Sequence, residues 1–209
     1  MTGVYHGGAG MVYARAAAVS PQPGRRAPRL SQQPRMQARI LWPAFLFLAP
    51  AVLCAQALPR IEARNLLGQT VNLPEASAGR PAILVIGFSH ASQNQTKPWD
   101  QRLEHEFDAS KVAVYPIAVL QAVPRLVRGM VVHGIKGGTP EEERGRYLLV
   151  YHHEDELKQA AGFQQPDDAY LLLVDPAGNV RWRFHGPVSD AAVMQLKTEV
   201  QGIEAPAAK

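Results

Sequence analysis

One strand–turn–helix unit constrains this chain more than any other stretch. Ala82–Phe88 is a continuous apolar run with the length and β-branched composition of a strand buried on both faces. The polar segment Ser89–Lys97 follows, and Trp99, Leu103 and Phe107 then recur every four residues, which predicts an amphipathic helix. In α/β folds, the turn beyond the carboxyl end of a strand usually carries the chemistry. This turn is therefore the first candidate site, and it contains no cysteine.

The remaining elements alternate between strand and helix patterns. Apolar periodicity and turn residues predict a hairpin within 58–73, strands at 112–120 and 147–151, helices at 124–136 and 154–162, a second hairpin over 169–185 and a final helix from Ser189. Pro116 within the second central strand indicates an edge position or a bulge. Thr139–Glu142 has the form of a helix start. The β–α–β order predicts a right-handed crossover and parallel pairing of the first two central strands.

The basic charge of the chain lies in its first 57 residues. The 209 residues hold 22 Lys and Arg against 18 Asp and Glu, but six of the arginines and none of the acids precede Leu58. Residues 58–209 therefore carry 16 basic against 18 acidic side chains, a net charge of −2. The high isoelectric point is a property of the leader, so we expect no nucleic-acid partner.

Met36–Ala57 has the three parts of a secretory signal. Arg39 supplies the positive start, Ile40–Cys54 is an apolar run, and a small-x-small cleavage site ends the segment. We expect translation to start at the first residue of this segment, with residues 1–35 untranslated or disordered, and cleavage after its last residue. The product would be periplasmic or secreted; the alternative is an uncleaved N-terminal membrane anchor. Cys54, the only cysteine, would leave with the leader.

This order of elements resembles that of the thioredoxin superfamily, in particular its redoxin branch. Two segments carry the resemblance: the lead-in NLLGQTVNLPEASAGRPAILVIGFSHAS and the closing hairpin YLLLVDPAGNVRWRFHGPV. The resemblance implies an α/β fold over residues 58–203, a thioredoxin-like three-layer sandwich with a central mixed β-sheet flanked by helices and an N-terminal β-hairpin. We expect residues 204–209 to be a frayed tail.

A narrower resemblance is to the mitochondrial ATP synthase assembly-factor family that carries a redoxin-like domain. The segments GFSHASQNQTKPW, VPRLVRGMVVHGIKGGTP and AYLLLVDPAGNVRWRFHGP carry it. The resemblance implies a chaperone for a membrane subunit of the synthase rather than a redox enzyme. A leader for export departs from the family's pattern and leaves the identity of the client open.

The catalytic cysteines of redox members are absent. Their Cys-x-x-Cys would start about five residues after Phe88, where this chain has Gln93–Thr96, and the peroxide-reducing branch needs a cysteine near Ser92. Dithiol exchange and thiol peroxidase chemistry are therefore excluded for the mature chain, and we expect no catalytic residue, cofactor or metal. We expect this degenerate turn to bind a protein partner, a membrane-associated one in the narrower resemblance. The candidate binding residues are Ser89, His90, Ser92, Gln93, Gln95, Thr96 and Trp99.

Positive charge also gathers in the insertion between the second and third central strands. The residues concerned are Arg125, Arg128, Lys136, Arg144 and Arg146. Two interpretations stay open here. The first is an ordinary solvated face, and the second is a surface for an anionic partner or for lipid headgroups.

Three interpretations compete at this point, and the third is a purely structural envelope protein without a catalytic role. The first is an exported, non-redox thioredoxin-fold protein that binds another protein as an assembly factor or chaperone. The second is an enzyme of non-thiol chemistry, or a metal-binding module, that uses Ser89, His90 or the pair His152–His153. No nucleophile or acid adjoins His90 in sequence, and no second cluster with ligand spacing supports the two adjacent histidines. These observations favour the first function.

Overall fold

The structure, a computed structural model, describes residues 56–204 except residue 78. An eight-stranded mixed sheet forms its centre, with the strand order β1-β8-β7-β4-β5-β6-β2-β3. The strands are β1 (Gln56–Ala57), β2 (Ile61–Asn65), β3 (Thr70–Leu73), β4 (Ala82–Gly87), β5 (Ala113–Val119), β6 (Leu148–Val150), β7 (Ala169–Val174) and β8 (Asn179–His185). The helices are α1 (Gln93–Glu106), α2 (Arg125–Gly137), α3 (Glu154–Ala161) and α4 (Asp190–Glu204), with 3₁₀ turns η1 (Glu75–Ser77) and η2 (Glu141–Glu143).

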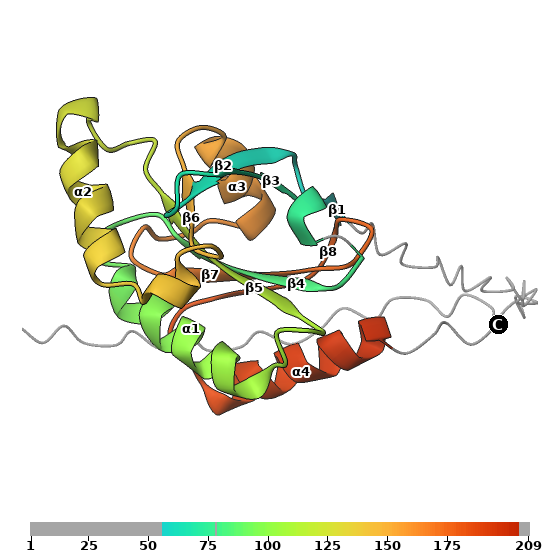
Figure 1. Cartoon of the computed structure of the whole chain (residues 1–209). Helices are drawn as coiled ribbons and strands as arrows, with labels where there is room; N and C mark the ends of the chain where they lie inside the picture. The colour runs from blue at the N-terminus through green and yellow to red at the C-terminus, as the bar shows by residue number, and fades with distance from the viewer. Residues whose placement is uncertain (1–55, 78, 205–209) are drawn as a thin grey trace, which may run out of the picture. The chain divides into compact units, whose positions relative to one another are not determined.

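Strands β4 and β7 form the buried middle of the sheet, and every residue in both strands is buried. Their alternate side chains enter two separate cores because successive residues of a strand point to opposite faces. Ile83 and Val85 pack with α1 and α4, whereas Leu84 and Ile86 pack with α3. Figure 1 shows this layering, with α1 and α4 side by side on one face and α3 on the other. The continuous apolar run at 82–88 is thus the expected two-sided strand.

The predicted pairings are confirmed. Strands β4 and β5 pair in parallel, from Ala82 opposite Ala113 to Gly87 opposite Ala118. The N-terminal hairpin forms between β2 and β3, and the second hairpin forms between β7 and β8, both antiparallel. Helix α1 buries Trp99 and Leu103, two of the three apolar residues whose spacing predicted this helix.

Two local predictions need correction. Strand β5 is an inner strand rather than an edge strand, yet β6 pairs with it only from Ile117 onward, so Pro116 is paired with β4 alone. Proline has no backbone N–H to donate, and at this position no second neighbouring strand requires one. No full helix follows Thr139, because its hydroxyl donates to the carbonyl oxygen of Ile135 at 2.8 Å and so caps the end of α2. Only the turn η2 forms there.

The last two residues of the expected leader form a short strand of the sheet. Gln56 and Ala57, placed at the end of the leader by the sequence, form β1 and pair with Val180 and Asn179 of β8. The rest of the leader and residues 205–209 lie outside the described residues. Within 56–204, no helix combines the length and the apolar character needed to cross a bilayer.

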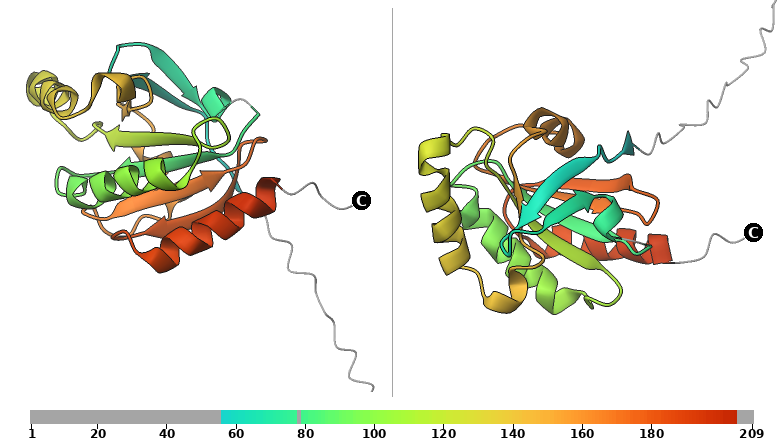
Figure 2. Two further views of the ribbon diagram at one scale, coloured as in Figure 1. Left: turned by 60° about the horizontal axis from the view of Figure 1, so that its bottom comes forward. Right: turned by 45° about the horizontal axis from the view of Figure 1, so that its top comes forward.

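Helix α2 differs from the other three helices because it buries no residue completely. Its inner side packs Val131, Val132 and Ile135 against a small cluster that contains Leu120 and Leu149. Figure 2 shows α2 at the rim of the domain in two further views. One side of this helix is therefore left without a protein neighbour in the described part of the chain.

Candidate functional site: the degenerate turn and the groove beside it

Two serines fix the turn between β4 and α1. The Ser89 hydroxyl donates to Asp167 Oδ1 at 2.7 Å and accepts the backbone N–H of Ser92 at 3.0 Å. The Ser92 hydroxyl donates to the Ser89 carbonyl oxygen at 2.7 Å, and its side chain is buried. A Cβ added at Gly87 would lie 2.5 Å from Ser92 Oγ, so the small residues at both positions let the turn close. Ser92 therefore shapes the turn from the inside.

A second network ties the first turn of α1 to β7 and β8. The side-chain oxygen of Gln95 accepts the backbone N–H of Ala169 at 3.1 Å, and its nitrogen donates to Asp168 Oδ1 at 3.3 Å. The other oxygen of Asp168 lies 3.0 Å from Nδ1 of His185. Gln95, an inner position of the four residues that stand where redox relatives are expected to carry Cys-x-x-Cys, thus makes structural hydrogen bonds to the start of β7.

Trp99 is a core residue. Its side chain is completely buried, and its indole N–H donates to the carbonyl oxygen of Gly186 at 2.9 Å. Its ring meets that of Phe184 edge to face at 5.5 Å. Because no part of the ring reaches the surface, Trp99 does not form part of a surface that a partner could contact in this conformation.

A groove of about 680 Å³ runs from the turn along α1 and under α2. Of the seven candidate residues in the turn and helix, three line it: His90, Gln93 and Thr96. The α1 residues beyond the turn that line it are Lys97, Asp100, Gln101 and Glu104. Apolar side chains form much of the opposite wall, and these are Pro116, Ile117, Met130, Val131 and Ile135. The structure thus joins the degenerate turn to a concave surface of mixed apolar and acidic character.

One end of this groove holds three carboxylates and a guanidinium. Arg146 Nη1 lies 2.7 Å from Asp100 Oδ1, Nη2 lies 3.1 Å from Glu143 Oε2, and Nη2 also contacts Glu104. Burial raises the pKa of Glu143; Arg146 opposes this effect, while Glu104 and Asp100 add to it. Burial, helped by the charge of Asp100, also raises the pKa of the neighbouring Tyr147 to about 12. Three acids face one base, so this end of the groove is negative.

The five basic residues of the insertion do not form one surface. Arg146 is paired with the three carboxylates. Arg128 donates to the carbonyl oxygen of Val123 at 2.9 Å, and Arg144 donates to that of Thr139 at 3.3 Å. Arg125 and Lys136 remain exposed on α2. The expectation of a common basic surface is therefore wrong for Arg146, because its charge is already paired within the domain.

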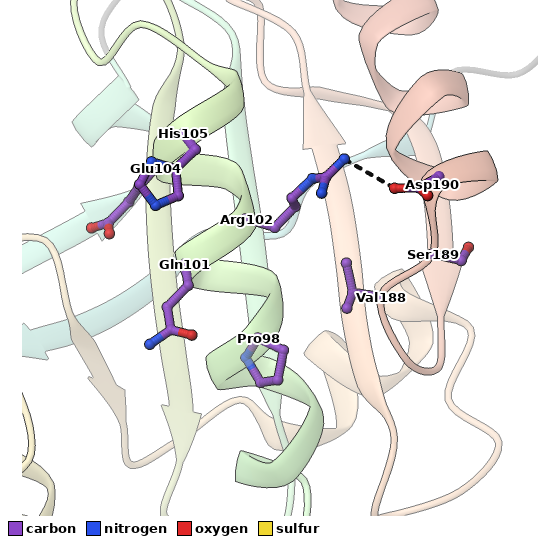
Figure 3. A pocket seen from close by; sticks show the side chains of 8 residues that line it. All are labelled: Pro98, Gln101, Arg102, Glu104, His105, Val188, Ser189 and Asp190. Carbon is purple, nitrogen blue, oxygen red and sulfur yellow. Dashed lines mark hydrogen bonds and ion pairs between the residues drawn. The ribbon is translucent and has the colours of Figure 1, made fainter.

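A second hollow lies on the other side of α1 and is about 670 Å³ in volume. Figure 3 shows it between α1 and the start of α4, where Arg102 reaches across to Asp190 at 3.0 Å. Gln101 and Glu104 point away from this contact, toward the other side of the helix. The exposed ion pair and the open shape give this hollow little capacity for selective binding.

The histidine pair is not part of a metal-binding group. Within residues 56–204 apart from 78, the one group of three or more acidic, histidine or cysteine side chains close enough to share a metal ion is Asp100, Glu104 and Glu143. Arg146 already contacts all three carboxylates. His153 instead lies 3.1 Å from Glu156 Oε1 at the start of α3. The arrangement gives no support to a metal site at His152 and His153.

Comparisons with known proteins can be set beside this geometry. Residues 47–203 match the family described as ATP10 protein. No curated protein sequence matches the chain. Among solved structures, a putative electron transfer protein from Aquifex aeolicus has a TM-score of 0.52 at 15% identity, over 70% of this chain and 96% of that one.

Two further structures have the same fold. The pneumococcal exposed lipoprotein thioredoxin Etrx1 from Streptococcus pneumoniae gives a TM-score of 0.51 at 14% identity, over 68% of this chain and 99% of that one. A putative thiol:disulfide interchange protein DsbE from Chlorobium tepidum gives 0.50 at 13% identity, over 72% and 97%. At these identities the likeness establishes the fold alone. The expected thioredoxin-like architecture is confirmed.

Proposed function

The chain belongs to the ATP10 protein family, and on that premise we propose that it is an assembly factor that binds a protein partner without thiol chemistry. The domain has a thioredoxin-like fold, but the only cysteine, Cys54, precedes it. The observation that carries the proposal is the groove between α1 and α2, which begins at the degenerate turn. Its wall comes partly from the insertion that contains α2, so the groove is built by a segment additional to the central sheet.

The lining of the groove suits an apolar segment with a positive charge. Met130, Val131 and Ile135 offer apolar contacts along α2, and the volume falls within the range of pockets that bury a drug-sized ligand. At the far end, Asp100 and its two acidic neighbours outnumber the single guanidinium of Arg146. A Lys or Arg of the partner placed there would balance the remaining negative charge.

Compartment and client are further parts of this proposal. The signal pattern at Met36–Ala57 supports action outside the cytoplasm, either after cleavage or with the leader as an anchor. The family resemblance supports a membrane subunit of the ATP synthase as the client. N-terminal sequencing of the protein recovered from cells tests cleavage: a start at Leu58 is expected, and a start within residues 1–35 or at Met36 would contradict it.

Filling the groove tests the binding surface. Gly134 lines the groove, and a Cβ added there meets no atom within 4 Å, so Gly134→Phe should fold and occupy the space. Gly129 is the matched control because it lies in the same helix, is equally open, and does not line the groove. We expect Gly134→Phe to impair assembly of the synthase in cells that lack the natural protein, while Gly129→Phe restores assembly.

A photo-crosslinking amino acid identifies the contact directly. Placed at Gln93, which is exposed and lines the groove, it should give an adduct with the client; placed at the exposed neighbour Asn94, which does not line the groove, it should not. Equal adducts from both positions would overturn the groove as the binding surface. Normal synthase assembly in cells without this protein would overturn the client.

A further inference from the structure

The outer face of α2 exposes large apolar side chains. Leu126 is 99% exposed, Met130 is 77% exposed and Val127 is 43% exposed. They account for three of the five large hydrophobic residues exposed in the described part of the chain, and all three lie on one helix of 13 residues. Their spacing places them on a single face, because residues four apart are neighbours on a helix surface. Leu126 and Val127 do not line the groove, whereas Met130 does, so this face adjoins the groove and extends beyond it.

The charge of α2 differs in sign from that of the rest of the domain. The helix contains Arg125, Arg128 and Lys136 and no acidic residue. Residues 56–204 hold 15 Lys and Arg against 18 Asp and Glu, so without α2 the balance is 12 against 18. Arg125 and Lys136 are exposed, whereas Arg128 donates its hydrogen bonds to backbone carbonyl oxygens.

We propose that this outer face of α2 rests on the anionic surface of a lipid bilayer. A helix with an exposed apolar face, flanking cations and no acids has the composition of an interfacial helix. The side chain of Leu126 is almost completely exposed. The helix that carries it, α2, lies at the rim of the domain (Figure 2). A soft acyl boundary accommodates such a projection without a preformed pocket, and anionic headgroups complement Arg125 and Lys136.

This face and the proposed partner-binding groove adjoin each other on α2. The adjoining side of the same helix lines the groove, and Met130 belongs to both surfaces. A domain that rests on the bilayer through α2 would hold its groove beside the membrane surface. Lipid contact and partner binding are nevertheless separable, since Leu126 belongs only to the first surface and Gly134 lines the second.

Co-sedimentation with vesicles tests the proposal on the protein as recovered from cells. We expect binding to vesicles of phosphatidylcholine with phosphatidylglycerol, and weaker binding to phosphatidylcholine alone. Arg125→Gln and Lys136→Gln should each weaken binding about fivefold. Leu126→Gln should weaken it as well, while Met194→Gln, a control on α4 that is 69% exposed, should not.

A local probe separates this helix from any contribution of the leader. In Leu126→Trp the new indole should be quenched by brominated anionic lipid, and in Met194→Trp it should not. Equal quenching in the two variants, or no quenching in either, overturns the proposal. Unchanged vesicle binding in Leu126→Gln, together with loss of the client adduct from Gln93, would assign the face to a protein contact instead.

Discussion

Replacing Arg146 by methionine tests the charge balance at the end of the groove. Arg146 is 22% exposed and contacts three carboxylates whose oxygens lie within 4.8 Å of one another. Two unit charges at that separation repel by about 3.5 kcal/mol at an effective dielectric constant of about 20. Solvent screens part of this repulsion, because Glu104 is 39% exposed. We therefore expect Arg146→Met to lower the free energy of unfolding by about 2–3 kcal/mol at neutral pH.

Acid should reverse much of this loss. Burial raises the pKa of Glu143 and Arg146 opposes the rise, so removing the guanidinium should raise the pKa of Glu143 further. A carboxyl group whose folded-state pKa exceeds its unfolded value destabilises the fold above that pKa. The penalty disappears as the pH falls through the folded-state value toward the unfolded one. The variant should therefore approach the wild type just above the ordinary carboxyl range.

Urea and thermal unfolding at neutral pH and near pH 5 measure both effects. For a domain of this size, a change of about 2–3 kcal/mol corresponds to a Tm shift of roughly 4–12 °C. Arg125→Met is the matched control, because Arg125 is exposed and its loss should change stability by less than about 0.5 kcal/mol. The reasoning is refuted if the two variants behave alike, or if the loss in Arg146→Met is the same at both pH values.

Three further variants probe other contacts. Trp99→Phe should cost about 1–3 kcal/mol in urea unfolding because it leaves the carbonyl oxygen of Gly186 without its donor; a smaller cost would imply a replacement partner. Ultraviolet titration should find one tyrosine that ionises near pH 12, and this titration should be missing in Tyr147→Phe. Because the pKa of tyrosine in the unfolded chain is about 10, the free energy of unfolding should fall as the pH rises from about 10 toward 12. Gly178→Ala should destabilise more than Gly68→Ala in thermal unfolding: both glycines have positive φ, but only at Gly178 does an added Cβ meet Pro74, at 2.8 Å.

Much of the fold could be predicted from the sequence because the patterns that indicate its strands, helices and hairpins are local. The apolar run before Ser89, the four-residue spacing after Lys97 and the two hairpins each lie within a short window. The network of Gln95, Asp168 and His185 gave no such signal, since its members lie 73 and 17 residues apart and meet only through the sheet. No local pattern distinguished these residues from ordinary surface side chains.

The charges of the insertion were the harder problem. Counting cations along the chain placed Arg146 on a basic surface, although it pairs with carboxylates from α1 and η2. Asp100 and Glu104 are four residues apart, so the sequence does place them on one side of a helix. Which cation would face them depended on how the insertion packs against α1, and hydrophobic periodicity does not contain that information.

Because β1 is short, most of β8 is an unpaired edge of the sheet in the described part of the chain. Only Val180 and Asn179 are paired by β1, so beyond Val180 the described chain offers β8 no neighbour on that side. An unpaired edge strand can pair with a strand of another chain and so promote aggregation, and charged side chains on the edge reduce this pairing. Arg181 and Arg183 are both exposed there, and Arg183 also reaches Gln56. In a form that lacked Gln56 and Ala57, these arginines would lie beside a longer unpaired stretch of β8, so replacing them should favour self-association of that form.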